Sequence, residues 1–229
     1  MILADLPGAA DAGVAIGCHV VPCDVRDSVS VRTAMDAACR KAGGVDMVIA
    51  NAGVATSGSI VDVDDDEADR VIDVNLRGYV RTVREAARLL RHQGSGGHIV
   101  IISSKNVFAP GKEFSLYSLT KAGGHQLGKI AAMELASDGI KVNMINPDAV
   151  FSGGGRQSGL WQEVGPGRAA AHGVDPADLE DFYRQRNLLQ TTVSAEDVGR
   201  AVLFFVSDQT PTTGASLPVD GGVPGAFPR

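Results

Sequence analysis

The stretch Gly97-His98-Ile99-Val100-Ile101-Ile102-Ser103 is a short, mostly β-branched run that is apolar on both faces. Such a strand is typical of a parallel sheet covered by helices on both sides. Five more runs predict strands: Ile2 to Asp5, His19 to Pro22, Val45 to Ala50, Ile140 to Ile145 and Ala215 to Val219. Helical patterns alternate with them: a short one near Gly8 to Val14, then Val29 to Ala42, Glu67 to Arg91, Ser115 to Ser137 and Ser194 to Val206. This alternation predicts a mostly parallel, doubly wound α/β sheet.

The segment from Phe151 to about Val193 departs from the alternation. It begins with glycine-rich sequence and continues through polar helical sequence, so we expect an insertion over the carboxyl edge of the sheet. We interpret residues 151–193 as a substrate lid, in which four side chains either line a pocket or pack the lid on itself: Trp161, Tyr183, Arg184 and Arg186. No repeat or linker divides the chain, so residues 1–229 are predicted to form a single domain.

The composition narrows the class of protein. The chain has 229 residues, 44% of them hydrophobic and 21% charged, which fits one domain with its own core. A net charge of −6 with scattered Lys and Arg argues against a nucleic-acid partner. No stretch approaches the roughly 20 apolar residues of a membrane helix, and no basic leader opens the sequence. We therefore expect a soluble cytoplasmic protein with no membrane partner.

Neither the cysteines nor the histidines indicate a disulfide framework or a metal site. Cys18, Cys23 and Cys39 are an odd number in one short region, which suits reduced thiols. The five histidines lack the spacing of metal ligands. The acidic run from Asp62 imitates the start of a calcium loop but has Glu67 where that loop requires glycine. We expect no bound metal.

The strongest chemical signal is Tyr117-Ser118-Leu119-Thr120-Lys121 at the start of a predicted helix, with Ser104 at the end of a predicted strand. Residues i and i+4 share a helix face, so the Lys121 ammonium is expected beside the Tyr117 phenol. A tyrosine with a pKa of about 10 is a poor base near neutral pH, but an adjacent cation favours the phenolate. We expect Lys121 to lower the pKa of Tyr117, so that the pair exchanges a proton with an alcohol or carbonyl.

With these residues the sequence resembles the short-chain dehydrogenase/reductase family over nearly its whole length. The match rests on residues in the family's order: Asn51-Ala52-Gly53, Asn75, Ser104, Tyr117, Lys121 and Val219-Asp220-Gly221-Gly222. The resemblance implies a Rossmann-type fold in which Tyr117 would be the general acid/base and Ser104 would hydrogen-bond the substrate oxygen. Lys121 would hold the nicotinamide ribose and Asn75 a proton-relay water, while hydride transfer belongs to the cofactor.

Several residues are expected to bind this cofactor, which we predict to be NAD. Asp5 ends the first strand, where a carboxylate accepts a hydrogen bond from the ribose 2′-OH and repels a 2′-phosphate. The alternative is an aspartate that only caps its loop. Asp24-Val25 resembles the family's adenine-contacting pair. The resemblance also implies cofactor contacts by Asn51, Ala52, Gly53, Tyr117, Lys121 and Pro147. Asp148, after Pro147, stands where most of the family has glycine.

The glycine-rich fingerprint that normally lies about 20 residues before the ribose-binding acid has no counterpart in this sequence. Only four residues precede Asp5. The sequence therefore predicts a Rossmann-type fold that lacks the family's first βα unit and its pyrophosphate cradle. Without that strand, either its neighbours close up, or residues 1 to about 42 shift or become mobile, or an exchanged segment fills the gap. We expect weak NAD binding or none.

Several stretches are similar to one branch of the family, the dehydrogenase domain of bifunctional rhamnulose-1-phosphate aldolase/alcohol (lactaldehyde) dehydrogenases. They are Ser104 to Asn106, Ala109 to Ser115, Asn146 to Phe151, Phe182 to Leu189 and Gly221 to Arg229. The resemblance implies hydride transfer between a nicotinamide cofactor and a small-molecule substrate, a lactaldehyde-like alcohol or hydroxy-aldehyde. The rival interpretation is a noncatalytic, truncated scaffold that no longer binds cofactor productively.

Small residues on two predicted helices suggest self-association. These helices carry more small residues than packing on one face of a sheet requires. They include Ala86, Ala87, Ala122, Ala131 and Ala132. In the resembled family these helices pair across a twofold axis, so we expect a homodimer or homotetramer.

Overall fold

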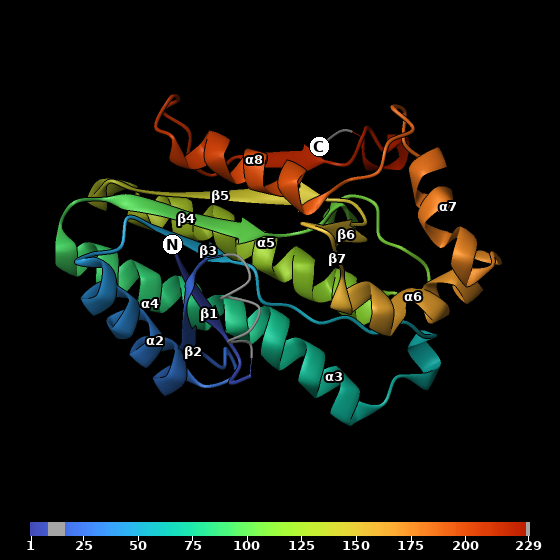
Figure 1. The fold of residues 1–229 in the computed structure, drawn as a ribbon, viewed down its shortest axis with the longest axis horizontal. Helices are drawn as coiled ribbons and strands as arrows, with labels where there is room; N and C mark the ends of the chain where they lie inside the picture. Colours follow the sequence, from blue (N-terminus) through green and yellow to red (C-terminus); the bar gives the residue numbers. More distant parts are fainter. Residues whose placement is uncertain (9–16, 228–229) are drawn as a thin grey trace.

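The apolar run from residue 97 forms strand β4 (Gly97–Ile102), an interior strand of a four-stranded parallel sheet. The order of the sheet is β3-β4-β5-β8, and its other strands are Met47–Ala50 (β3), Ile140–Pro147 (β5) and Ser216–Val219 (β8). The computed structural model in Figure 1 describes residues 1–8 and 17–227. The parallel α/β sheet is confirmed. The helix predicted near Gly8 to Val14 falls almost wholly on residues 9–16, outside the described residues.

Both faces of β4 are buried, because successive side chains of a strand point to opposite sides. Ile99 and Ile101 pack in one core with α4 (Gly78–Gln93) and α5 (Ser115–Leu135). Val100 and Ile102 pack in a second core with α8 (Ala195–Val206). Figure 1 shows α8 on one side of β4 and β5 and α4 on the other. The sheet is thus covered by helices on both faces, as the sequence predicts.

The first two strands form a separate two-stranded parallel sheet. In it β1 (Ile2–Asp5) pairs with β2 (His19–Pro22), and among the described residues neither strand is hydrogen-bonded to β3. The next helix, α2 (Ser28–Ala42), packs on both β2 and α4. Of the three alternatives for this region, the one in which neighbouring strands close up is therefore wrong for the described residues. The lack of a first βα unit stays a prediction.

The long helix predicted from Glu67 to Arg91 is interrupted. The structure has α3 (Asp65–Val71), then a π-helical segment over Ile72–Arg77, then α4. Apolar periodicity does not distinguish a π turn from an α turn, so the sequence pattern missed it. Such π segments are frequent at functional sites, and this one contains Asn75.

The predicted insertion forms its own small subassembly beyond the end of β5. It contains a short hairpin of β6 (Ser152–Gly153) and β7 (Arg156–Gln157), followed by α6 (Gly159–His172) and α7 (Leu179–Gln185). Trp161 and Tyr183 pack against each other and against Phe151. The insertion is thus partly held together by aromatic contacts.

The expected surplus of small residues on the outside of α4 and α5 is wrong. Four of the five small residues, Ala86, Ala87, Ala131 and Ala132, are buried in the core between the sheet and helices α4 and α5. These four residues pack against other helices and strands of the same chain, and of the five only Ala122 is exposed. A homodimer or homotetramer stays a prediction.

Three other structural features bear on the sequence analysis. Within residues 1–8 and 17–227, no helix is long and apolar enough to span a bilayer. The same residues contain no group of three or more His, Cys, Asp or Glu placed to hold a metal ion. Cys18, Cys23 and Cys39 form no disulfide with one another.

Candidate active site

A cavity of about 590 Å³ lies at the carboxyl ends of β3, β4 and β5, where folds of this type bind ligands. Six of the predicted site residues line it: Asn51, Gly53, Ser104, Tyr117, Lys121 and Pro147. They come from four places far apart in the sequence: the loops after β3 and β4, the end of β5 and the first turns of α5. The structure therefore brings most of the predicted site together.

Tyr117 and Ser104 face each other across the end of β4. Hydrogen bonding with Ser104 lowers the pKa of Tyr117, but burial outweighs it and raises that pKa to about 12. The Phe114 ring stacks on the Tyr117 ring with a centroid distance of 4.6 Å, and this contact helps to hold the phenol in place. Ser104 itself accepts hydrogen bonds from the backbone N and the side-chain Nδ2 of Asn106, at 3.2 and 3.1 Å. The expected lowering of the Tyr117 pKa is therefore wrong for the ligand-free protein.

The surroundings of Lys121 explain part of the difference between the expected and the observed pKa of Tyr117. Its Nζ donates to the Ile102 carbonyl at 2.8 Å and to the hydroxyl of Tyr79, a residue that the sequence analysis did not single out. Nζ lies 5.5 Å from the centroid of the Tyr117 ring. Burial lowers the pKa of Lys121 to about 7, which weakens the preference of its side chain for the charged form. Spacing along one helix placed Lys121 beside Tyr117 but could not reveal a partner from another helix.

Asn75 lies behind the cavity wall and is fully buried. Its Oδ1 accepts from the Val54 N at 2.8 Å, and its Nδ2 donates to the Val54 carbonyl at 2.8 Å and to Thr120 Oγ1 at 3.1 Å. The amide thus joins the loop after β3 to α5, next to Tyr117. The predicted relay water is not tested by these contacts.

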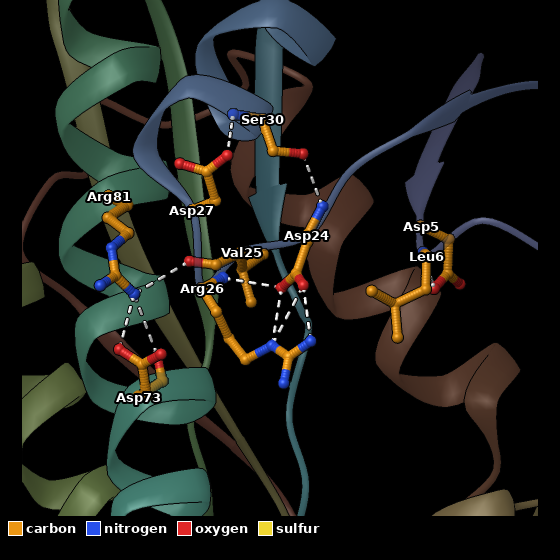
Figure 2. Close-up of polar contacts among 9 residues, drawn as sticks. All are labelled: Asp5, Leu6, Asp24, Val25, Arg26, Asp27, Ser30, Asp73 and Arg81. Atoms are coloured by element: carbon orange, nitrogen blue, oxygen red, sulfur yellow. Dashed lines mark hydrogen bonds and ion pairs between the residues drawn. The ribbon is translucent and has the colours of Figure 1, made fainter.

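The residues expected to bind the adenosine half do not line this cavity. Asp5 ends β1, and Asp24 and Val25 lie just after β2 (Figure 2). Asp24 accepts hydrogen bonds from the Arg26 guanidinium at 2.7 to 3.1 Å, and this contact holds the pKa of its carboxyl below the ordinary value. The Val25 carbonyl accepts from Arg81 at 3.2 Å. Asp5 is exposed and accepts from the Leu6 N at 2.7 Å, the local bond expected of a loop-capping aspartate. Both interpretations of Asp5 stay open.

Several lining residues were not predicted as site residues. Asp148 lines the cavity and forms a two-point ion pair with Arg186, whose guanidinium lies 3.9 Å from the centroid of the Tyr183 ring. Trp161 and Tyr183 both line the cavity and pack the insertion, so the two roles considered for them coexist. Apolar residues of α8, Val198 and Val202, form another part of the wall. Their signal was only an amphipathic pattern, which any core helix shows.

Comparison with known proteins supports the resemblance from which these site residues were predicted. Residues 9–162 match the protein family described as short chain dehydrogenase. The chain is 39% identical over 210 residues to the uncharacterised oxidoreductase YuxG of Bacillus subtilis (strain 168), covering 91% of this chain but only 30% of that relative's length.

Two solved structures have the same fold. The crystal structure of sorbitol-6-phosphate 2-dehydrogenase SrlD from Erwinia amylovora is 29% identical, with a TM-score of 0.87 over 96% of this chain and 88% of that one. The 3-ketoacyl-(acyl-carrier-protein) reductase from Brucella melitensis, complexed with NADH, is 26% identical, with a TM-score of 0.81 over 96% of this chain and 86% of that one.

Proposed function

The chain belongs to the family of NAD(P)-dependent short-chain dehydrogenases/reductases, and on that premise we propose that it transfers a hydride between a nicotinamide cofactor and a small alcohol or hydroxy-aldehyde. The observation that carries the proposal is the convergence of Ser104, Tyr117 and Lys121 on one cavity. A phenol, a hydroxyl and an ammonium around one space are the groups needed to move a proton at a carbinol or carbonyl oxygen.

In this proposal each group has one task. The Tyr117 phenol, protonated at neutral pH because its pKa is about 12, gives its proton to a carbonyl oxygen and takes it back in the reverse direction. The Ser104 hydroxyl donates a hydrogen bond to the same oxygen. A bound nicotinamide supplies the hydride. The Lys121 ammonium, at the cavity wall, stabilises negative charge on the phenol during the transfer.

The described residues suit the nicotinamide half of a dinucleotide. A Cβ added at Gly53 would lie 3.5 Å from Asn75 Oδ1 and 3.6 Å from Lys121 Nζ, so the glycine leaves the space beside the ammonium open. Asn51 and Pro147 would complete that half. We propose NAD rather than NADP, because the exposed Asp5 carboxylate would repel a 2′-phosphate. The NADH complex of the Brucella melitensis relative is consistent with this choice.

Titration calorimetry with NAD and NADP tests the role proposed for Asp5. We expect NAD to bind more tightly than NADP, and tighter binding of NADP would contradict that role.

We propose a lactaldehyde-like substrate. Four of the five stretches that carry the narrower resemblance contribute residues to the cavity wall. In that wall Asp148, neutralised by an ion pair with Arg186, accompanies the aromatic side chains of Tyr183 and Trp161. A neutral pair in an aromatic wall suits a small uncharged hydroxy compound. The sorbitol-6-phosphate enzyme of Erwinia amylovora makes a phosphorylated polyol the natural competitor in the assay.

Turnover measured at high NAD concentration, with lactaldehyde and with sorbitol 6-phosphate, tests the proposed activity. We expect oxidation of the smaller compound and a loss of at least about a hundredfold in Tyr117→Phe. Gln126→Ala, an exposed change farther along α5, is the matched control and should keep the rate. Turnover that survives Tyr117→Phe would contradict the role proposed for Tyr117, whereas no turnover with any substrate or NAD concentration would favour the noncatalytic scaffold.

We also propose that the outer face of α5 pairs with a second copy of the chain. Leu119, Ile130 and Met133 are exposed apolar residues on this helix, and their spacing puts them on one face. Light scattering should report a dimer or tetramer that Met133→Glu dissociates. Val29→Glu, at an exposed position on α2, is the control.

A further inference from the structure

Tyr79 lies in the apolar core, yet its hydroxyl makes two polar contacts. Its ring is 2% exposed and packs in the core between α4, α5 and the sheet. Its hydroxyl donates to the Ile102 carbonyl and accepts from Lys121 Nζ. A phenylalanine would fill the same apolar space, so the hydroxyl serves these two contacts. Buried phenols are retained where the hydroxyl finds partners.

The neighbouring helix leaves room for this phenol. A Cβ on Gly124 of α5 would lie 2.3 Å from Tyr79 Cδ2, so any side chain there would displace the ring. Gly124 is three residues after Lys121, on the same helix face. Two pairs spaced by four residues therefore lie close together: Asn75 of the π-helical segment with Tyr79 of α4, and Tyr117 with Lys121 of α5.

The hydrogen bonds of Lys121 fix the direction of its ammonium. An ammonium has three N–H donors, and two of them go to Tyr79 Oη and the Ile102 carbonyl. Lys121 also lines the cavity beside Gly53. The third donor is therefore the one left for the cavity.

We propose that Tyr79 is a positioning residue, whose hydroxyl holds the Lys121 ammonium so that its remaining N–H faces the cavity. The role rests on the proposed function, since it matters for turnover only if Lys121 supports Tyr117. The contact between the two side chains is testable without cofactor or substrate.

The electrostatic surroundings define what the contact does. Lys121 faces Tyr117 from its own helix, Tyr79 from α4 and the Ile102 carbonyl from β4. Burial alone lowers the Lys121 pKa to about 7. Because the Tyr79 hydroxyl accepts a hydrogen bond from the charged form, its removal should lower the Lys121 pKa further. The pKa of Tyr117, on which Ser104, Asp148 and Tyr183 also act, should then rise.

The test is a pH titration of the Lys121 side chain by ¹³C NMR of the intact chain, with the resonance assigned from Lys121→Met. In Tyr79→Phe, which keeps the ring and removes one hydroxyl, we expect the midpoint to fall by about one pH unit. Val83→Ala, one turn along α4 in the same core, is the matched control for disturbed packing and should leave the midpoint unchanged. An unchanged midpoint in Tyr79→Phe, or an equal change in both variants, would overturn the proposal.

A second measurement covers the case in which Tyr79→Phe does not fold. In the chain labelled with ¹³C-tyrosine, Lys121→Met should move the Cζ resonance of Tyr79, because its hydroxyl loses a charged donor. No movement would overturn the proposal.

If turnover is detected, the acidic limb of its pH profile should move to higher pH in Tyr79→Phe, with a larger effect on kcat than on the substrate KM. The NMR result and the Tyr117→Phe result are independent. A failure of one therefore does not decide the other.

Discussion

The central sheet and the β1–β2 unit are both parallel sheets of short strands, yet they differ in what holds them. Strand β4 has a hydrogen-bonded neighbour on each side and helices on both faces, and Ile99, Val100 and Ile101 are fully buried. Strand β1 has β2 on one side, and within the described chain nothing pairs with its other edge. The groups proposed as catalytic therefore stand on the sheet with more hydrogen-bonded and buried neighbours, whereas Asp5 and Asp24 stand on the sheet with fewer.

Hydrogen exchange should show the largest difference between the two sheets. Backbone amides open with free energies that range from near zero to the full stability, according to burial and neighbouring contacts. We expect the amides of β4 and β5 to be protected at least about a thousandfold more than those of β1 and β2. Mass spectrometry of peptides that cover each strand measures this ratio. Equal protection would mean that the β1–β2 unit opens only with the whole domain.

A matched pair of substitutions probes the same contrast through stability. Val100→Ala empties part of the core under α8, and we expect it to lower the free energy of unfolding by about 2 to 3 kcal/mol. Val20→Ala makes the same change on the half-buried β2 and should cost about 1 kcal/mol or less. Urea unfolding followed by circular dichroism measures both. A larger loss for Val20→Ala would contradict the contrast.

The same contrast explains how much the sequence predicted. The strands of the central sheet were located to within two residues, because a run apolar on both faces has few alternatives. Placement of Ser104, Tyr117 and Lys121 at one cavity follows from such strands and from the i, i+4 rule. Features that depend on contacts between distant segments were not predictable: the π turn at Asn75, the hydroxyl of Tyr79, and the balance of burial and charge at Tyr117.

A buried histidine on α5, which packs on the central sheet, predicts that the stability of the chain depends on pH. His125 on α5 is 2% exposed, and burial with nearby Lys129 lowers its pKa to about 4. The folded chain therefore keeps it neutral while the unfolded chain takes up a proton below about pH 6.5. Stability is fully present above pH 6.5 and is lost as the pH falls towards 4, by about 2 kcal/mol between pH 6.5 and 5.

Urea unfolding across this pH range measures the effect of His125. The variant His125→Gln should lose this part of the slope, whereas Gln126→Ala, the exposed neighbour, should keep it. An unchanged slope in His125→Gln would assign the acid sensitivity to other groups.

The smallest expected effect concerns a contact between α4 and the loop that follows β2. Arg81 of α4 donates to the Val25 carbonyl, just after β2, at 3.2 Å and to Asp73 in the π-helical segment at 2.9 Å (Figure 2). The guanidinium and the carboxylate are partly exposed, so solvent screens the pair and its net contribution is about 1 kcal/mol.

Arg81→Gln should therefore lower the free energy of unfolding by about 1 kcal/mol or less, while it raises the exchange of β1 and β2 amides and leaves β4 and β5 unchanged. Arg88→Gln, farther along α4 and more exposed, removes an ion pair with Glu85 and controls for the lost charge. Because Arg81 links Val25 to Asp73 in the π-helical segment that carries Asn75, its loss should also weaken NAD binding more than Arg88→Gln does. Equal exchange of β2 in both variants would show that packing of α2 on α4, rather than Arg81, holds the β1–β2 unit in place.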